Sequence, residues 1–539
     1  MHGDQQLSNT ANKVLHLSVT TWRTIFTWIS WMFMVILIMS FIFIYTITNR
    51  NYNQVFYIDR NAPAVFTTSE KFLSIALDSS VIARGPNAYN FSNRRLLNMI
   101  KYMQPAYFRI GGTMGDRLHF NANTTVKNYY EYFDLLQDGD SCAYEDDYCD
   151  FVPRPNFTMT AQQWLMLNSV ATEANLDIIF GLNALIRNAD GSWNFENAKE
   201  LIKFSADHNL EINWELGNEP DAFMHQFNYV VNATQLAKDF RTLRHILNIN
   251  ERYKYSILVG PDVTRPIEGH QKKEKFFESF ISHAKPAINS ITWHQYYFNG
   301  RTALPGDFVD VSILDLLATQ IAAVKQIQSN AGASELPIWL GETSSAYGGG
   351  AKGMSDRFIA SFMWLDKLGL SAQMGLDVVI RQSILQGNYA LIGEDYTPSP
   401  DWWVSVLHKR LVGPVVVNSS FVSYPELRLY AQCTSNNVPY FQGSSVTIFG
   451  INIKNVFANI RIQGLSEKAT RIYIYELTTD HLFSRNVFLN GVRLTLTEEG
   501  YLPPMEPKIV SINTDLEMQP YSVMFFVIPN AQVKACDNH

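Results

Sequence analysis

Two glutamates at the ends of short apolar runs are the residues of this sequence best suited to chemistry. The run Ile212–Leu216 alternates like a strand and is followed by Glu219 and then by Pro220, which cannot extend a central strand. About 120 residues later, Leu336–Leu340 leads in the same way to Glu342. A carboxylate placed where a buried strand ends is held rigidly and still faces a cleft. Two such carboxylates are the minimum equipment for glycoside hydrolysis, in which one donates a proton and the other acts as nucleophile or base.

Strand-like and helix-like segments alternate through the middle of the chain. Eight buried strands alternating with helices are typical of a (β/α)8 TIM barrel, and we predict this α/β fold for residues 71–402. A doubly wound open sheet is the competing interpretation, but no G-x-G-x-x-G motif follows an early strand. Glu219 and Glu342 would then follow the fourth and seventh strands, at the end of the barrel that carries catalytic groups. The predicted strands are Phe72–Leu77, Ala106–Ile110, Leu176–Leu182, Ile212–Leu216, Tyr255–Val259, Ile288–His294, Pro337–Leu340 and Leu376–Ile380.

Beyond the barrel the helical pattern fades and short alternating runs replace it. We therefore predict an appended C-terminal β-sandwich over residues 403–539, with residues 48–70 supplying a linker and one more sandwich strand. The alternating runs are Leu427–Ala431, Val446–Ile451, Ile472–Glu476 and Val523–Ile528.

The N-terminal segment contains a long apolar run. Residues 25–47 carry no charge and are numerous enough to cross a bilayer as a helix. A cleaved signal peptide would have a shorter apolar core, and a buried core helix would be less uniformly apolar. We predict an N-terminal transmembrane helix at residues 25–47 that acts as an uncleaved signal anchor, with residues 1–24 as a short cytoplasmic tail.

Asparagine sequons and cysteines indicate the compartment of the remaining chain. Five N-x-S/T triplets all lie C-terminal to the apolar run, which favours a single-pass type II membrane protein with a lumenal or extracellular body on the secretory or lysosomal route. That compartment is oxidising, so we expect two disulfides, Cys142–Cys149 and Cys433–Cys536. The asparagines of the sequons are Asn90, Asn123, Asn156, Asn232 and Asn418.

The overall composition limits the possible partners. The formal net charge of −7 argues against a generic nucleic-acid binder, which would usually be basic. Hydrophobic content of 47% with 17% charged residues indicates a globular chain. Residues 124–154 lack apolar periodicity, contain Cys142 and Cys149, and are predicted to form an acidic surface insertion.

Four motifs give the sequence a family resemblance. The triplet Asn218–Pro220 resembles the acid/base motif of clan-A glycoside hydrolases. The segments Trp214–Pro220, Trp293–Tyr297, Leu340–Gly350 and Phe362–Ala372 resemble heparanases, from about residue 70 to Cys536, and the hyaluronan-cleaving endo-β-glucuronidases share these motifs. The resemblance implies a retaining mechanism with Glu219 as general acid/base and Glu342 as nucleophile, whose carboxyl groups would lie roughly 5–5.5 Å apart.

The resemblance also implies roles for other residues. Asn218 would hold the sugar 2-hydroxyl, and Gly348, Gly349 and Tyr389 would grip the glucuronate carboxylate, the glycines through their backbone N–H groups. The hydroxyl of Tyr296 and the cation Arg381 are candidates to keep Glu342 ionised, whereas Glu215 is interpreted as a barrel-interior carboxylate without a role in the chemistry. The other predicted substrate-binding residues are Asp78, Arg109, Asn183, His294, Arg301 and Gln382.

The substrate is the point on which the sequence leaves alternatives. Pro261-Asp262-Val263 is followed by few positive charges, whereas a basic cluster stands there in vertebrate-type heparanases, and sulfate recognition depends on cations. The expected activity is an endo-β-glucuronidase of heparan sulfate, or of a less sulfated polymer such as hyaluronan. An exo-acting glucuronidase and a catalytically silent glycosaminoglycan-binding membrane protein are the alternatives. Nothing in the sequence indicates a metal or organic cofactor, and the oligomeric state is left open.

Overall fold

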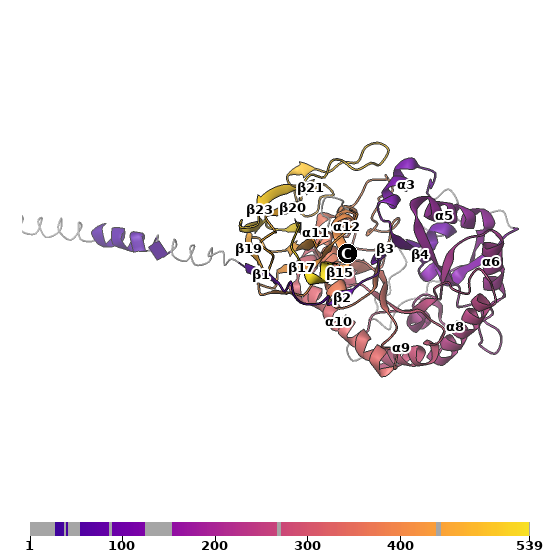
Figure 1. Cartoon of the computed structure of the whole chain (residues 1–539). Coiled ribbons are helices and arrows are strands. Elements are labelled where there is room, and N and C mark those ends of the chain that lie inside the picture. Colours follow the sequence, from indigo (N-terminus) through magenta and orange to yellow (C-terminus); the bar gives the residue numbers. More distant parts are fainter. Residues whose placement is uncertain are drawn as a thin grey trace, which may run out of the picture. The chain divides into compact units, whose positions relative to one another are not determined.

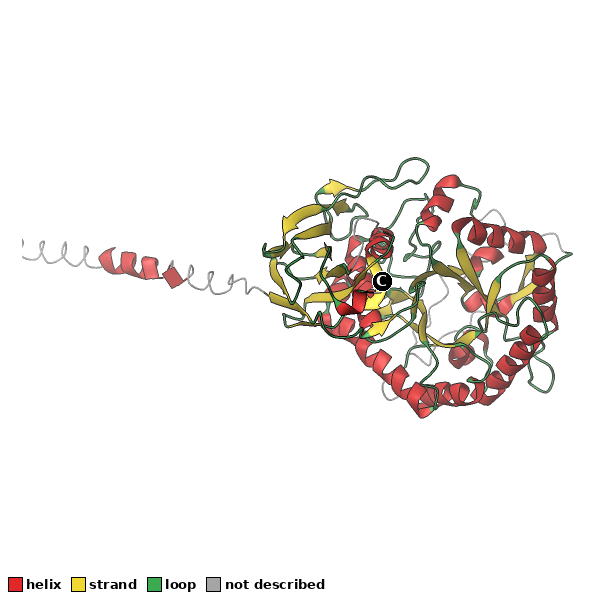
Figure 2. Ribbon diagram, viewed as in Figure 1, coloured by secondary structure: helices red, strands yellow, loops and turns green. Residues whose placement is uncertain are grey.

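Eight parallel strands, each followed by a helix, form one sheet within residues 54–539 (Figures 1 and 2). The computed structural model describes residues 27–36, 39–40, 54–85, 89–123, 154–266, 271–437 and 444–537. The strands are β3 (Leu73–Asp78), β4 (Ala106–Gly111), β7 (Leu176–Leu182), β8 (Ile212–Leu216), β9 (Val259–Val263), β10 (Ser290–Gln295), β12 (Ile338–Thr343) and β14 (Val378–Arg381). The helices that follow them are α3 (Arg94–Lys101), α5 (Ala161–Ala174), α6 (Glu196–Asp207), α8 (Ala233–Asn248), α9 (Gln271–Ala284), α10 (Val311–Asn330), α11 (Phe358–Gln373) and α12 (Pro400–Leu411).

The sheet is nearly closed into a barrel. Its strand order is β8-β7-β4-β3-β14-β12-β10-β9, and a parallel bridge between Trp214 and Leu258 joins the two ends. This arrangement confirms the predicted (β/α)8 architecture. The fifth strand, however, starts at Val259 rather than at Tyr255. The predicted boundary was wrong because the chain turns at residues 251–255 and Tyr255 is 87% exposed, as a barrel strand residue would not be.

The barrel interior has an apolar floor beneath a polar rim. Its floor includes Tyr107 and Trp339, whose rings stack with centroids 4.9 Å apart. Because side chains alternate along a strand, Arg109 and Gly111 face the same interior as Tyr107. Strict alternation from Trp339 would turn Glu342 away from this interior. The pairing of β12 with β14 shifts register between Leu340 and Thr343, and irregularities of this kind re-aim a side chain.

Two antiparallel-rich sheets occupy the C-terminal part together with residues near Gln54. They share one apolar core that includes Phe56, Ile448 and Phe526. The four-stranded sheet contains β16 (Ser419–Phe421), β1 (Gln54–Ile58), β19 (Ala458–Gln463) and β24 (Leu516–Met518). The second sheet contains β2 (Phe66–Thr67), β15 (Val412–Val416), β17 (Leu427–Thr434), β18 (Val446–Asn452), β25 (Ser522–Ile528), β20 (Arg471–Thr478), β21 (Phe488–Leu489), β22 (Val492–Arg493) and β23 (Lys508–Ser511).

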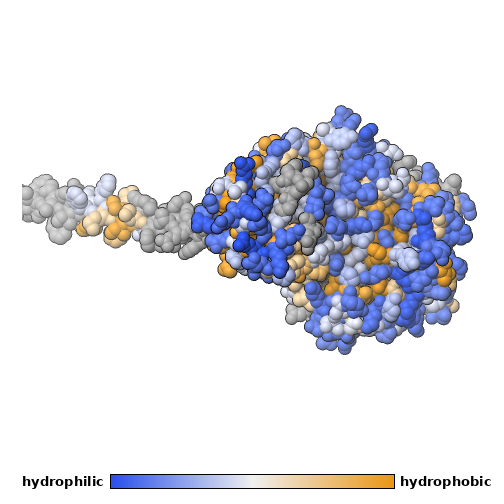
Figure 3. All heavy atoms as spheres, in the orientation of Figure 1, coloured by the Kyte–Doolittle hydropathy of each residue, from blue (hydrophilic) through white to orange (hydrophobic). Residues whose placement is uncertain are grey.

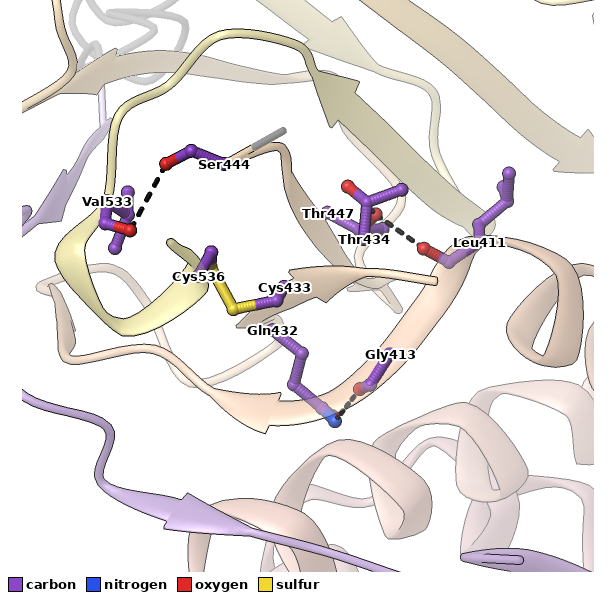
Figure 4. The surroundings of a disulfide bond; sticks show 9 residues. All are labelled: Leu411, Gly413, Gln432, Cys433, Thr434, Ser444, Thr447, Val533 and Cys536. Atoms are coloured by element: carbon purple, nitrogen blue, oxygen red, sulfur yellow. Dashed lines mark hydrogen bonds between the residues drawn. A yellow bond between two sulfur atoms is a disulfide. The ribbon is translucent and has the colours of Figure 1, made fainter. Parts of the chain in front are cut away.

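Helix α11 packs between the barrel and the second sheet. A Cβ atom built on Gly369 would lie 2.1 Å from the ring of Tyr430, so only glycine permits this close approach. The hydroxyl of Tyr430 donates to Asp366 of the same helix at 2.6 Å. In the core shared by the two sheets, the predicted disulfide Cys433–Cys536 is present and anchors the C-terminal 3₁₀ turn to β17 (Figure 4).

Some sequence-based predictions fall wholly or partly outside the described residues. Of the predicted membrane span at residues 25–47, residues 27–36 and 39–40 are described and helical. Within the ranges given above, no helix combines the length and the apolarity needed to cross a bilayer. The other residues of the predicted span lie outside the description. Residues 124–153, which contain Cys142 and Cys149, and the tail at residues 1–24 lie outside the description.

Short elements complete the barrel and its loops. A short parallel ladder pairs β5 (Leu118–Asn121) with β6 (Phe157–Thr160), and another pairs β11 (Phe298–Asn299) with β13 (Ala346–Tyr347). Helices α2 (Ser80–Ala83) and α7 (Phe223–Phe227) follow β3 and β8. Polar residues predominate on the visible face of residues 54–539, interrupted by scattered apolar ones (Figure 3).

Candidate active site

The two strand-end glutamates lie at the carboxyl end of the barrel. Glu342 is the fifth residue of β12, and Glu219 follows β8 after a turn in which Gly217 adopts a φ of 79°. Glu219 is itself left-handed, with a φ of 54°, which costs a non-glycine residue roughly 1–2 kcal/mol. Its backbone N–H donates to the carbonyl of Asp262 at 2.9 Å, which ties the β8 loop to β9.

Glu342 accepts hydrogen bonds on both carboxylate oxygens. Arg109 Nη1 donates to Oε2 at 2.8 Å, and the hydroxyl of Tyr296 donates to Oε1 at 2.7 Å. The glutamate side chain is 10% exposed. Donors to both oxygens, one of them cationic, favour the ionised form of a carboxylate. This environment suits a nucleophile.

Glu219 has a different environment. His294 Nδ1 lies 3.1 Å from its Oε1, and the amide of Gln226 donates to its Oε2 at 3.0 Å. The residue is only 3% exposed. Burial of a carboxyl group favours the protonated form, whereas a neighbouring imidazolium favours the ionised form. A group placed between these two influences can both give up and take back a proton.

Arg109 links the two glutamates. It is fully buried on β4 and uses three nitrogens: Nη1 for Glu342, Nη2 for Asn218 Oδ1 at 3.0 Å, and Nε for Glu215 Oε2 at 3.1 Å. Asn218 directly precedes Glu219, so one guanidinium holds the end of β8 against the end of β12. Burial opposes its charge, but Glu215, Asp262 and Glu342 outweigh this and raise the pKa of Arg109.

His294 is the second cation of the site. In the pairing of β10 with β12 it stands opposite Glu342, and its Nε2 lies 3.2 Å from Asp262 Oδ1. Burial alone would lower the pKa of His294, but the charge of Glu342 and the hydrogen bonds to Asp262 and Glu219 raise it to about 10. These contacts favour the charged imidazolium, whose two nitrogens can donate to the carboxyl groups of Glu219 and Asp262.

A second group of predicted residues lies on the next strands of the barrel. Gln382 donates to Asp78 Oδ2 at 3.0 Å, and burial raises the pKa of Asp78. The ring of Tyr389 stacks on that of Tyr296 with centroids 6.3 Å apart. The charge of Asp78 adds to burial in raising the pKa of Tyr389, so its hydroxyl stays protonated.

The glycine loop after β13 approaches the same tyrosine. Gly348, Gly349 and Gly350 have φ values of 72°, 82° and 86°, which favour glycine. A Cβ atom on Gly350 would lie 2.9 Å from Tyr389. Between described residues, the N–H groups of these three glycines donate to no protein acceptor. The loop can therefore offer several amides to an anion.

Comparisons with known proteins agree with this geometry. Residues 87–369 match the family model "Glycosyl hydrolase family 79, N-terminal domain". The chain is 35% identical over 499 residues to the heparanase of Rattus norvegicus, covering 87% of this chain and 92% of that protein. The chain belongs to glycosyl hydrolase family 79. It is thus a glycoside hydrolase, as the motifs predicted.

Other similar proteins carry names that state different activities. The hyaluronoglucuronidase of Hirudo nipponia is 31% identical over 500 residues, with 89% of this chain and 98% of that protein covered. The human protein named inactive heparanase-2 is 31% identical over 524 residues, with 88% of each covered. A 4-O-α-L-rhamnosyl-β-D-glucuronidase structure from Fusarium oxysporum matches with a TM-score of 0.62 at 15% identity, over 88% of this chain and 99% of that one. At that identity the structure supports the fold alone.

Three residues that were predicted to act at the site have surroundings that differ from the prediction. The side chain of Asn183 donates to the Leu118 carbonyl at 3.0 Å and accepts from the Leu185 amide at 2.8 Å, so it is occupied by the backbone. Arg301 is exposed on the loop after β11. Arg381 pairs with Asp401 of α12 at 2.6 Å, so the prediction that it serves Glu342 was wrong. It points toward the helical layer, and Arg109 provides the cation instead.

Three polar residues at the site were not predicted to act there. Asp262, Gln226 and Asp116 carry no motif of their own, although Asp262 is a strand-end residue. Asp116 accepts from the backbone amides of Ala184 and Asn218, both at 2.8 Å, and so joins two loops. Its burial raises its pKa to about 7.

The described residues also include possible metal-binding side chains and the predicted sequons. Within the ranges that the structure covers, no group of three or more His, Cys, Asp or Glu side chains is arranged to hold a metal ion. The asparagines of all five sequons are exposed: Asn90, Asn123, Asn156, Asn232 and Asn418.

Proposed function

We propose that this chain is a retaining endo-β-glucuronidase that hydrolyses glucuronate linkages in glycosaminoglycans. The observation that carries the proposal is the unequal environment of the two glutamates. Glu342 has donors on both oxygens, one of them the buried Arg109, whereas Glu219 is buried beside a histidine and an amide. The first environment suits a nucleophile and the second suits a proton donor.

In this mechanism Glu342 attacks the anomeric carbon while Glu219 protonates the departing glycosidic oxygen. Water then hydrolyses the glycosyl-enzyme, with Glu219 acting as base. Arg109 and Tyr296 hold the nucleophile in place, and Asn218 is positioned by Arg109 to meet the sugar 2-hydroxyl. The proposal requires the two carboxyl groups to be about 5–5.5 Å apart.

The glycine loop after β13 is proposed to make the site specific for glucuronate. The N–H groups of Gly348, Gly349 and Gly350 and the hydroxyl of Tyr389 are the groups proposed to bind the glucuronate carboxylate. A backbone nest binds an anion without a cationic side chain. Asp78 and Gln382 would contact hydroxyls of the same sugar.

The polymer that is cleaved is proposed to carry little sulfate. The relatives include proteins named heparanase and one named hyaluronoglucuronidase, so hyaluronan is the second candidate. Arg265, which follows β9, donates to the Tyr296 carbonyl at 2.7 Å and lies 5.7 Å from the ring centroid of Tyr347. This arginine is engaged by the protein, which favours a substrate that needs few cations.

The proposal also covers the C-terminal sheets and the compartment of the protein. The two C-terminal sheets, with their shared core, are proposed to act as a β-sandwich that supports the barrel. The exposed sequons and the disulfide Cys433–Cys536 support a lumenal or extracellular body.

The test compares wild type with Glu342→Gln and Glu219→Gln on heparan sulfate and hyaluronan, with size analysis of the products. Glu335→Gln, at an exposed glutamate just before β12, is the matched control. We expect Glu342→Gln to abolish cleavage. Glu219→Gln should retain its first step on an aryl glucuronide, whose good leaving group needs no proton. Intact polymer with wild type would instead favour a catalytically silent binding protein; one relative is named inactive heparanase-2.

A further inference from the structure

Helix α11 carries a buried lysine that the proposed mechanism does not use. Lys367 lies in the segment Phe362–Ala372, one of the motifs that carry the family resemblance, and is 1% exposed. Its Nζ donates to the side-chain Oε1 of Gln295 at 2.6 Å, to the hydroxyl of Thr343 at 2.5 Å and to the backbone carbonyl of Ser344 at 2.7 Å. All three acceptors lie at the carboxyl ends of β10 and β12.

These acceptors are neighbours in sequence of two active-site residues. Thr343 directly follows Glu342, and Gln295 directly precedes Tyr296, whose hydroxyl donates to Glu342 at 2.7 Å. In the pairing of β10 with β12, Gln295 stands opposite Thr343, one position beyond Glu342. One amine from the helical layer therefore contacts both strands immediately beside the proposed nucleophile and its hydroxyl donor.

The backbone beside Glu342 is irregular. The pairing of β12 with β10 and its pairing with β14 both shift register close to this residue. Such irregularities disrupt the ladder of backbone hydrogen bonds, so the ladder alone constrains the strand end less. Lys367 binds the Ser344 carbonyl just past the irregularity, and the hydroxyl of Thr343 donates to the backbone carbonyl of Gln295. These side-chain contacts link the two strand ends where the ladder is disrupted.

The contacts do not depend on the protonation state of the amine. Burial and the nearby charge of Arg381 lower the pKa of Lys367 well below its usual value, although Asp401 and Asp366 oppose the shift. The ring of Tyr297 lies 4.4 Å from Nζ and offers a favourable surface to a cation. A lysine amine has at least two N–H groups in either form, enough for the side-chain and backbone carbonyl oxygens that it contacts.

We propose that Lys367 is a positioning residue for the nucleophile: it holds the ends of β10 and β12 together and so keeps the Glu342 carboxylate within hydrogen-bond distance of Tyr296 and aimed at the sugar. The inference rests on the role proposed above for Glu342. Because Lys367 lies on the helical side of β12, it acts through Gln295 and Thr343 and does not touch the sugar.

Replacing Lys367 with methionine tests the proposal in the full-length protein. Methionine keeps an unbranched apolar side chain of similar length but donates no hydrogen bond, so the strand ends are free to shift. A misplacement of about 1 Å can slow a reaction about 100-fold. In single turnovers of an aryl glucuronide, we expect the maximal rate to fall about 100-fold. The half-saturating concentration should change less than about threefold, because the groups proposed to bind the glucuronate carboxylate are unchanged.

Lys409→Met is the matched control. Lys409 is a lysine of the next helix, α12, and its Nζ donates to the carbonyl of Pro105, just before β4 begins at the opposite end of the barrel. Both variants should lower the urea midpoint of unfolding, but Lys409→Met should keep the maximal rate within about threefold of wild type. An equal loss of rate in the two variants, or an unchanged rate in Lys367→Met, would overturn the proposal.

Two substitutions of Thr343 keep the proposal testable if Lys367→Met does not fold. Thr343→Val has nearly the same shape but lacks the hydroxyl, and it should lower the maximal rate about 10-fold. Thr343→Ser keeps the hydroxyl and should stay within about threefold of wild type. Equal rates for these two variants would overturn the proposal. Failure of both Lys367→Met and Thr343→Val to fold would assign these contacts to folding and would overturn it as well.

Crystal structures separate this inference from the proposed function. In Lys367→Met the distance from the Tyr296 hydroxyl to the Glu342 carboxylate should grow from 2.7 Å to more than about 3.5 Å, whereas in Lys409→Met it should not change. An unchanged distance in Lys367→Met would overturn the positioning role while leaving the role of Glu342 intact. If wild type cleaves no glucuronide, the proposed function fails, but these structures still decide whether Lys367 positions Glu342.

Discussion

Replacing His294 with glutamine tests the charge at the centre of the site. The imidazole is 1% exposed and lies between Glu219 and Asp262, at 3.1 and 3.2 Å. Because these carboxylates and Glu342 raise its pKa to about 10, the folded protein keeps a proton there that the unfolded chain releases near pH 6.5. Glutamine retains polar atoms but carries no charge, so the variant removes this proton linkage.

The expected magnitude follows from the shift of the pKa. A change from 6.5 to about 10 corresponds to a stabilisation of about 5 kcal/mol at most. Because the pKa is raised, His294 stabilises the folded protein fully below pH 6.5. This stabilisation is lost as the pH rises through 10. In that window the contribution of His294 to the free energy of unfolding falls by about 1.4 kcal/mol per pH unit, or about 3 kcal/mol from pH 7 to pH 9.

Urea unfolding followed by tryptophan fluorescence at pH 6, 7, 8 and 9 measures this difference between wild type and His294→Gln. Burial also raises the pKa of acids that do not contact His294, but these are common to both proteins and cancel in the comparison. His408→Gln is the matched control, because burial lowers the pKa of His408 to about 3 and that imidazole is neutral throughout this range. A stability difference for His294→Gln that stays constant from pH 7 to pH 9 would mean a neutral imidazole and would refute the charge assignment.

Three further substitutions give measurable expectations. Tyr296→Phe removes a hydrogen bond of 2.7 Å to the proposed nucleophile and should lower kcat/KM about 10- to 100-fold, since such bonds to charged groups contribute about 1.5–3 kcal/mol; an unchanged rate on an aryl glucuronide would contradict this. Gly369→Ala places a Cβ 2.1 Å from the ring of Tyr430 and should destabilise the protein by about 1–3 kcal/mol in calorimetry, whereas Gly306→Ala, which meets no atom within 4 Å, should not. Replacing both cysteines of the C-terminal disulfide with alanine opens a link between residues 103 apart and should cost about 4–5 kcal/mol, visible as a lower thermal midpoint of the non-reduced protein; an unchanged midpoint would show that this link constrains little.

The barrel could be predicted from the sequence because its signals are local. Each parallel strand is buried on both faces, so it appears as a continuous apolar run, and polar residues mark the point where it ends. Glu219 and Glu342 could be identified in the sequence for the same reason, because each follows an apolar run. The start of the fifth strand was misplaced because Tyr255 is of a residue type common in strands but lies in a turn and is 87% exposed.

The partners of the two glutamates could not be predicted, because they depend on how the barrel closes. Arg109 and Arg381 both lie on barrel strands, and only the direction of each side chain decides which of them reaches Glu342. Alternation places Arg109 above Tyr107 in the interior, whereas Arg381 turns toward Asp401 in the helical layer. A register shift in β12 then turns Glu342 toward Arg109, and this shift cannot be predicted from the residue types of the strand.

The location of the cations also bears on the substrate. Arg109 and His294 are almost completely buried and are occupied by carboxylates, so they balance internal charge and are not available to attract an anionic polymer from solution. A chain with a net charge of −7 likewise has no long-range attraction for such a polymer. Recognition of the polymer must then come from short-range contacts, and the amides of the glycine loop after β13 are suited to a carboxylate. We therefore expect a polymer that carries carboxylates but little sulfate to be cleaved better than a densely sulfated one, because Arg109 and His294 are already occupied by carboxylates.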